Sequence, residues 1–157
     1  SALMSEWMSQ PLEVPGNNRS DPLQTLGTYI LVIRCLRRSC IPVGVLGLMP
    51  LYRGWYLYAG SAFGPGGLGA RLRRHLQTDK TKHWHIDTLV AHCALVDIWY
   101  RCASRGLEHI WAQTLVSHQD TVIPLAGFGA SDCRCSSHLV WLRSRKEVNG
   151  IRRILGT

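Results

Sequence analysis

The chain has 157 residues, a hydrophobic fraction of 46%, a charged fraction of 18% and a formal net charge of +8. This length suits one ordinary domain, and the composition is that of a chain that buries a core, which excludes a disordered polypeptide. No apolar run reaches the roughly 20 residues that a membrane-spanning helix needs, and the first residues lack the pattern of an export signal. We therefore expect a soluble, cytoplasmic protein.

The first 26 residues differ from the rest of the chain. Residues 11–21 are rich in Pro, Gly, Asn and Ser without periodicity, which predicts a flexible arm before a single domain at residues 27–157. Residues 1–26 have one Arg against three acidic residues, residues 27–90 have nine Lys and Arg against two, and residues 91–157 have eight against five. Positive charge thus peaks early in the domain, which favours a nucleic-acid partner.

Three β-rich segments open the domain. Residues 28–33, 41–48 and 55–59 contain many β-branched and aromatic side chains, and short polar connections separate them. Short connections between consecutive strands favour an antiparallel meander.

Helices and strands alternate in the remainder of the chain. The Gly-rich stretch 60–67 predicts a loop, and leucines at a spacing of four predict a helix over residues 68–77. The further elements expected are a short helix in 83–93, a strand in 94–102, a helix in 107–118, a Gly, Ser and Cys loop in 124–137, a strand in 138–142 and a final helix in 147–155. This order predicts an α+β domain with a small, mainly antiparallel sheet flanked by helices.

Five side chains, in this order along the chain, suit phosphodiester cleavage. Tyr29 and Tyr58 lie in the first and third predicted strands, and Arg71 and His75 lie four apart on one helix, so they project from nearly the same face. A guanidinium matches phosphate oxygens, an imidazole transfers protons near neutral pH, and the carboxylate of Glu108 suits a hard divalent cation. Hydrolysis of a phosphodiester needs these three functions together.

These motifs resemble those of the GIY-YIG nuclease superfamily, which has a Gly-x-Tyr strand, a Tyr-x-Gly strand, a helix with Arg-x-x-x-His and a later helical Glu. The longer blocks of this chain are still more similar to one branch of it, the DUF123 family, which is sometimes fused to endonuclease-III-like repair enzymes. The blocks are Gly27-Thr28-Tyr29, Tyr58-Ala59-Gly60-Ser61-Ala62, Gly64-Pro65-Gly66-Gly67-Leu68, Arg71-Leu72-Arg73-Arg74-His75, His83-Trp84-His85-Ile86-Asp87 and Gly127-Phe128-Gly129-Ala130-Ser131-Asp132-Cys133.

The resemblance implies a metal-dependent endonuclease of DNA repair or processing. Tyr29 and Tyr58 would line the site, with one of them acting as general base or orienting the water. Arg71 would steady the scissile phosphate, His75 would assist proton transfer, and Glu108 would hold one Mg²⁺ or Mn²⁺.

We expect the nucleic acid, DNA rather than RNA, to contact side chains on the Arg71 helix and on the loops beside it. These are Arg73, Arg74, Lys80, Lys82, His83, His85, Ser131 and Asp132. The superfamily often has an Asn after the metal-binding Glu, whereas here none follows Glu108 before Asn149. Ser131 or Asp132 could replace it. A non-catalytic nucleic-acid-binding module on the nuclease fold is therefore the alternative.

The six cysteines are expected to be reduced thiols, because the chain has no export signal and is large enough to need no disulfide. Two patterns, His83-x-His85 and Cys133-x-Cys135-x-x-His138, contain residue types that bind zinc. Structural zinc sites usually use the wider Cys-x-x-Cys spacing. Packing, or lining of the nucleic-acid cleft, is therefore the favoured interpretation of both patterns, with zinc as the secondary alternative.

Overall fold

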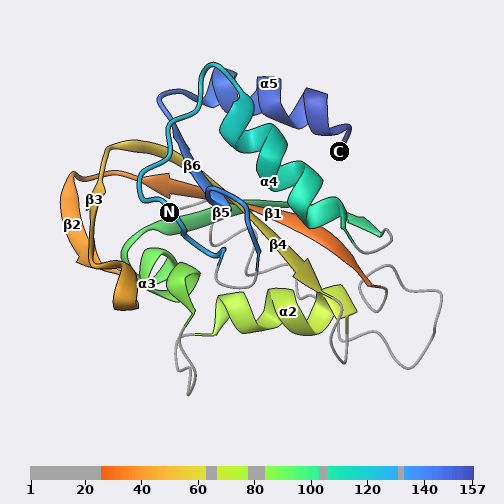
Figure 1. Ribbon diagram of the computed structural model, residues 1–157, viewed down its shortest axis with the longest axis horizontal. Coiled ribbons are helices and arrows are strands. Elements are labelled where there is room, and N and C mark those ends of the chain that lie inside the picture. Colours follow the sequence, from red (N-terminus) through yellow and green to blue (C-terminus); the bar gives the residue numbers. More distant parts are fainter. Residues whose placement is uncertain (1–25, 63–66, 78–83, 103–105, 131–132) are drawn as a thin grey trace.

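The computed structural model describes residues 26–62, 67–77, 84–102, 106–130 and 133–157, so nearly all of the predicted arm lies outside the described residues. The fold is an α+β domain built on an antiparallel sheet of four strands in the order β5-β1-β4-β6 (Figure 1). The strands are β1 (Gly27–Cys35), β4 (Gly54–Ala62), β5 (Ala94–Cys102) and β6 (Leu139–Leu142). The helices are α2 (Gly67–Leu76), α3 (His85–His92), α4 (Leu107–Ser117) and α5 (Arg145–Leu155). The predicted fold class is confirmed.

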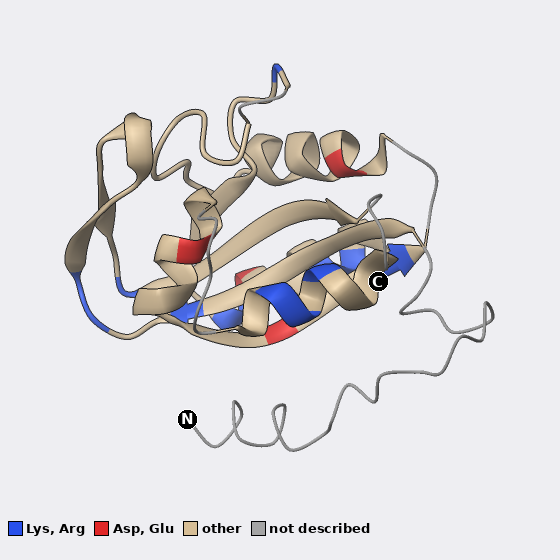
Figure 2. Cartoon of the chain, turned by 90° about the horizontal axis from the view of Figure 1, so that it is seen from below, with Lys and Arg blue, Asp and Glu red and all other residues tan. Residues whose placement is uncertain are grey.

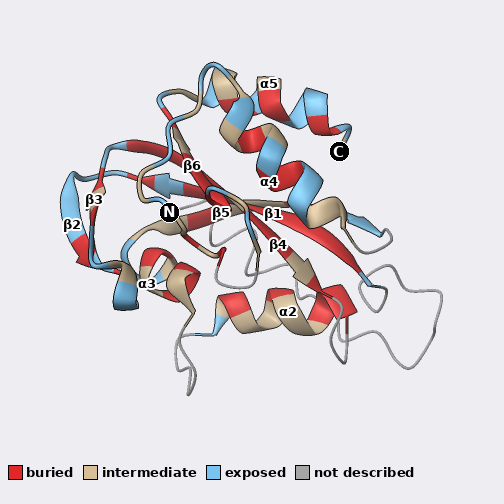
Figure 3. Cartoon of the chain, in the orientation of Figure 1, coloured by how far each residue is buried: buried red, intermediate tan, exposed pale blue. Residues whose placement is uncertain are grey.

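Helices cover both faces of this sheet, α2 and α3 on one side and α4 and α5 on the other (Figure 1). Successive side chains of a strand point to opposite faces. Leu31 of β1 therefore packs under α2 and α3, while Ile30 and Val32 pack under α4 and α5. The central strands are the most deeply buried part of the described chain (Figure 3). No described helix is both long and apolar enough to cross a bilayer.

The prediction of one strand over residues 41–48 is wrong. Two short strands, β2 (Ser39–Pro42) and β3 (Leu48–Leu51), form a separate two-stranded sheet with a 3-10 turn at Gly44–Leu46 between them. Gly44 and Gly47 have φ values of 47° and 88°, in the left-handed region that glycine favours, and they interrupt the strand. The predicted three-strand meander is consequently absent from the described sheet, because β1 pairs directly with β4.

The loop predicted over residues 60–67 begins later than expected, because Gly60, Ser61 and Ala62 belong to β4. Gly60 lies opposite Tyr29 in the β1–β4 register. A Cβ atom on Gly60 would lie 2.4 Å from both Cζ and the hydroxyl oxygen of Tyr29. This glycine therefore serves a close approach within a regular strand, not a turn.

Two neighbouring thiols, those of Cys35 and Cys93, lie in or against the core. Burial, the charge of Cys35 and a hydrogen bond with it raise the pKa of Cys93 to about 12. At pH 8 the Cys93 side chain is then almost entirely the unreactive thiol. We expect iodoacetamide at pH 8 to label the exposed Cys40 of the native protein and to leave Cys93 unmodified, as measured by peptide mass spectrometry. Equal labelling of both would contradict this, and the denatured protein is the control in which both react.

Candidate active site

The outer edge of β4 is covered over only part of its length. β6 pairs with Trp55–Tyr58, and the carbonyl of His138 then accepts a hydrogen bond of 2.9 Å from the N–H of Ala59. Beyond Ala59 no described strand pairs with this edge. From Gly60 to Ala62, β4 therefore has one edge that no described strand pairs with.

Ser61, at this open edge, links helices from the two faces. Nε of Arg71, on α2, donates a hydrogen bond of 3.0 Å to the carbonyl oxygen of Ser61. The Ser61 side chain lies close enough to the carboxylate of Glu108, in the first turn of α4, to lower its pKa. Helices α2 and α4 cover opposite faces of the sheet (Figure 1), and each contributes one charged side chain next to Ser61.

Tyr29 and His75 form a buried pair between β1 and α2. The Tyr29 hydroxyl lies 2.6 Å from Nε2 of His75, and each residue is 1% exposed. Burial raises the pKa of Tyr29 well above its ordinary value, and the nearby Tyr58 raises it further while Arg71 opposes the rise. The phenol therefore keeps its proton, and it is placed to donate a hydrogen bond to Nε2 of His75 when that nitrogen is unprotonated.

Tyr58 lies on the same face of the sheet and is partly exposed. Its ring packs edge-on against Phe128, with ring centroids 6.0 Å apart. Burial raises the pKa of Tyr58, the charge of Glu108 raises it further, and the charge of Arg71 lowers it. Since Arg71 and Glu108 act on both tyrosines, the structure brings the predicted catalytic and metal-binding residues into one region.

Glu108 is held from a second direction by His138. Its Oε1 atom lies 3.1 Å from Nδ1 of His138, and the same Nδ1 lies 3.0 Å from the carbonyl oxygen of Ala59. Burial alone would raise the pKa of Glu108, but hydrogen bonds from His138 and Ser61 outweigh burial and leave the pKa below its ordinary value. Burial likewise opposes protonation of His138, yet hydrogen bonds with Glu108 and Cys133 raise its pKa to about 9. Glu108 is therefore an ionised carboxylate at neutral pH.

Arg71 is supported by Trp84, which the sequence did not assign to the site. The Arg71 guanidinium carbon lies 4.2 Å from the centroid of the Trp84 ring. Arg74 stacks on this ring too and donates two hydrogen bonds of 3.0 Å to the carboxylate of Asp87. Arg74 thereby joins α2 to α3, and Trp84 helps to fix the orientation of Arg71.

The predicted nucleic-acid contacts are only partly described. Arg73 is partly exposed on α2, and Nδ1 of His85 accepts a hydrogen bond of 3.1 Å from the N–H of Gly129. The other predicted contacts, apart from Arg74, lie outside the described residues: Lys80, Lys82, His83, Ser131 and Asp132. Basic residues outnumber acidic ones along the described chain (Figure 2).

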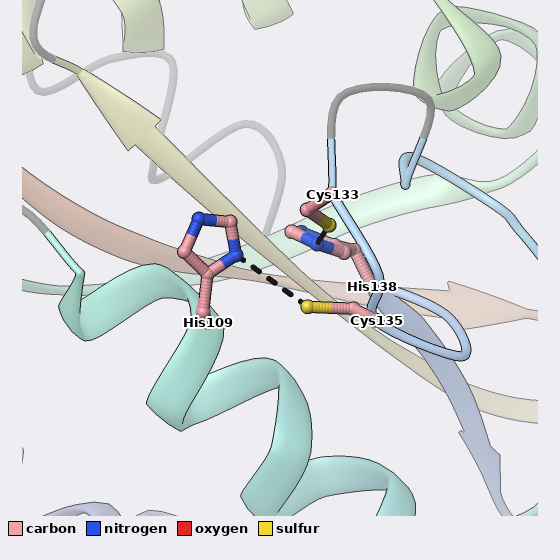
Figure 4. A group of neighbouring side chains, drawn as sticks. All are labelled: His109, Cys133, Cys135 and His138. Carbon is pink, nitrogen blue, oxygen red and sulfur yellow. Dashed lines mark hydrogen bonds between the residues drawn. The ribbon is translucent and has the colours of Figure 1, made fainter.

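His109, Cys133, Cys135 and His138 form a cluster of side chains (Figure 4), and His138 joins this cluster to Glu108. Sγ of Cys133 lies 3.1 Å from Nε2 of His138, and Sγ of Cys135 lies 3.4 Å from Nδ1 of His109. The four donor atoms all lie within 4.8 Å of one another. His109 was not identified from the sequence, because only the fold brings α4 against the loop before β6.

The family model described as "Domain of unknown function DUF123" matches residues 28–155. No curated protein and no solved structure matches the chain. The matched segment includes all strands and helices of the described domain except the first residue of β1. The chain therefore belongs to the DUF123 family.

Proposed function

We propose that this protein is a metal-dependent endonuclease that hydrolyses phosphodiester bonds in DNA, in the manner of the GIY-YIG nucleases. The observation that supports this best is the convergence of Arg71 and Glu108 on Ser61, beside Tyr58. No ion pair joins Arg71 to Glu108 in the described structure; each is held by other partners. Opposite charges kept apart in this way suit a site that takes a phosphate and a cation between them.

Arg71 would bind the scissile phosphate. Ser61 accepts the hydrogen bond from Nε and Trp84 lies beneath the guanidinium, so the group has one orientation. In the described structure the terminal nitrogens form no hydrogen bond, which leaves four of the five guanidinium N–H groups for phosphate oxygens. A fixed guanidinium stabilises the charge that develops on the phosphate in the transition state. It does so better than the ammonium group of lysine, because the planar guanidinium matches two phosphate oxygens at once.

Glu108 would hold one Mg²⁺ or Mn²⁺. Its carboxylate is ionised, and His138 and Ser61 occupy only part of its capacity to accept ligands. Magnesium commonly binds through one or two carboxylates and keeps several waters, so a single carboxylate beside a substrate phosphate fits its chemistry. When bound, the ion would polarise the phosphate and lower the pKa of a bound water.

Neither tyrosine would ionise, and only Tyr58 would position the attacking water. The pKa values of Tyr29 and Tyr58 are both raised, so both phenols are neutral at working pH. Tyr58, which is partly exposed, would hydrogen-bond the water. Tyr29, which is buried, would hold Nε2 of His75, and this imidazole would assist proton transfer.

The direct test is cleavage of a panel of labelled DNA and RNA structures with Mg²⁺ or Mn²⁺, compared with EDTA. We expect metal-dependent cleavage of DNA by the wild-type protein and a loss of cleavage in Glu108→Gln, which keeps the shape of the side chain and removes its charge. Salt-sensitive binding without cleavage at any pH would overturn the nuclease and favour a binding module. Failure to bind any nucleic acid would overturn both.

A further inference from the structure

The cysteine and histidine cluster has the dimensions of a tetrahedral zinc site. Tetrahedral coordination with Zn–S near 2.3 Å and Zn–N near 2.0–2.1 Å separates neighbouring ligand atoms by about 3.3–3.8 Å. The two separations across the cluster, Cys133 Sγ to His138 Nε2 and Cys135 Sγ to His109 Nδ1, are 3.1 and 3.4 Å. Since no pair of donor atoms exceeds 4.8 Å, side-chain adjustments of about 1 Å would complete a tetrahedron.

The donor set selects the metal. Two thiolates and two imidazoles are ligands for zinc and other borderline-soft cations, whereas Mg²⁺ and Ca²⁺ take oxygen ligands. Packing explains the cluster poorly, because Cys133 and Cys135 are only partly buried and His109 is exposed. Hydrogen bonding explains it poorly too, since a thiol is a weak donor and a weak acceptor.

His138 is already oriented as a metal ligand. It is 1% exposed, and its Nδ1 atom faces both the Ala59 carbonyl oxygen and Oε1 of Glu108. Two acceptors at Nδ1 hold a proton on that nitrogen, so Nε2, which faces Cys133, is the nitrogen at which a metal ion would replace a proton. Histidine ligands of zinc commonly donate their second N–H to a carboxylate or carbonyl in this way.

We propose that His109, Cys133, Cys135 and His138 bind one zinc ion. The protein supplies all four ligands, which is typical of a structural site and not of a catalytic one. The ion would tie the loop before β6 to the first turn of α4 (Figure 4). This inference does not rest on the proposed nuclease function. The zinc site is separate from the Mg²⁺ or Mn²⁺ expected at Glu108, because Glu108 is not one of the four ligands and contacts only the far nitrogen of His138.

The test is the metal content of the full chain, purified under reducing conditions without added zinc and analysed by mass spectrometry of the elements. We expect about one zinc ion per chain. The ion should be lost in Cys133→Ser and in His109→Ala. Cys40→Ser is the matched control: Cys40 is an exposed free thiol of β2, and this variant should keep its zinc.

The proposal would be overturned if the wild-type protein and Cys133→Ser contained the same amount of zinc. Because a variant that loses zinc could also have misfolded, cobalt substitution of the wild-type protein provides the second measurement. We expect intense visible d–d bands, typical of tetrahedral Co²⁺, and sulfur-to-cobalt charge-transfer absorption in the near ultraviolet. Folded, reduced wild-type protein that binds no zinc and gives no charge-transfer band with Co²⁺ would also overturn the proposal.

Discussion

Arg71→Ala is expected to lower the rate of DNA cleavage by about 10²–10³-fold, which is the range found when one positioned donor to a transition state is removed. The substitution deprives the substrate of the terminal N–H groups of Arg71. It also removes the hydrogen bond to Ser61 and the contact with Trp84. The measurement is the single-turnover rate with saturating protein, which separates chemistry from binding. The rate constant should fall much more than the affinity.

A pair of companion variants makes this result specific. Arg71→Lys keeps the charge and loses the planar fork, so it should recover only a small part of the rate. Arg153→Ala removes an exposed arginine from α5, on the opposite face of the sheet, and should cleave at the wild-type rate. Residual cleavage that is equal in Arg71→Ala and Glu108→Gln would point to a contaminating nuclease. A wild-type rate in pure Arg71→Ala would refute the assigned role.

The elements of the domain that depend on local pattern were predictable from sequence. Leucines at a spacing of four gave α2, and the β-rich composition of residues 28–33 gave most of β1. One error falls where a glycine is required by a contact between residues far apart in the sequence. Gly60 was interpreted as a loop residue because glycine is common in loops, yet it lies in β4 under the ring of Tyr29, which is 31 residues away in sequence. A contact between residues so far apart cannot be predicted from local amino-acid composition.

The candidate site shows the same division between local and long-range information. The spacing of Arg71 and His75 predicts that they share a helix face, and both lie on α2. That Arg71 and Glu108 both lie next to Ser61 does not follow from any spacing in the sequence, because they come from helices on opposite faces of the sheet. Nothing in the spacing of Cys133 and Cys135 indicates that His109 completes their cluster, since α4 and this loop meet only in the folded chain.

His138 connects the two proposed metal sites. One ring nitrogen faces Glu108 and the other faces Cys133, and the ring itself is buried. A zinc ion on the thiolate side would therefore fix the position of the carboxylate on the other side. On this account zinc takes no part in cleavage but keeps Glu108 oriented, so chelation of zinc should reduce cleavage even when Mg²⁺ is in excess.

Gly60→Ala is expected to destabilise the fold by about 2–4 kcal/mol, the sum of overpacking and of a weakened buried hydrogen bond. The usual effect of replacing glycine by alanine within a strand is the opposite, because glycine loses more conformational freedom on folding. Here the added Cβ would lie 2.4 Å from Cζ and the hydroxyl oxygen of Tyr29. The ring must move, and its 2.6 Å contact with Nε2 of His75 would be lost. The measurement is the free energy of unfolding from urea titration.

Gly150→Ala is the matched control, since Gly150 lies within α5 and a Cβ there meets no atom within 4 Å. Its expected effect is a stabilisation of about 0.5–1 kcal/mol, because alanine is the better helix former. A double-mutant cycle with Tyr29→Ala tests the cause. If the clash is responsible, Gly60→Ala should cost much less in the Tyr29→Ala background, where the ring is absent. A cost that stays the same in both backgrounds would show that Gly60 is required by the strand itself, and that Tyr29 does not depend on it for its position beside His75.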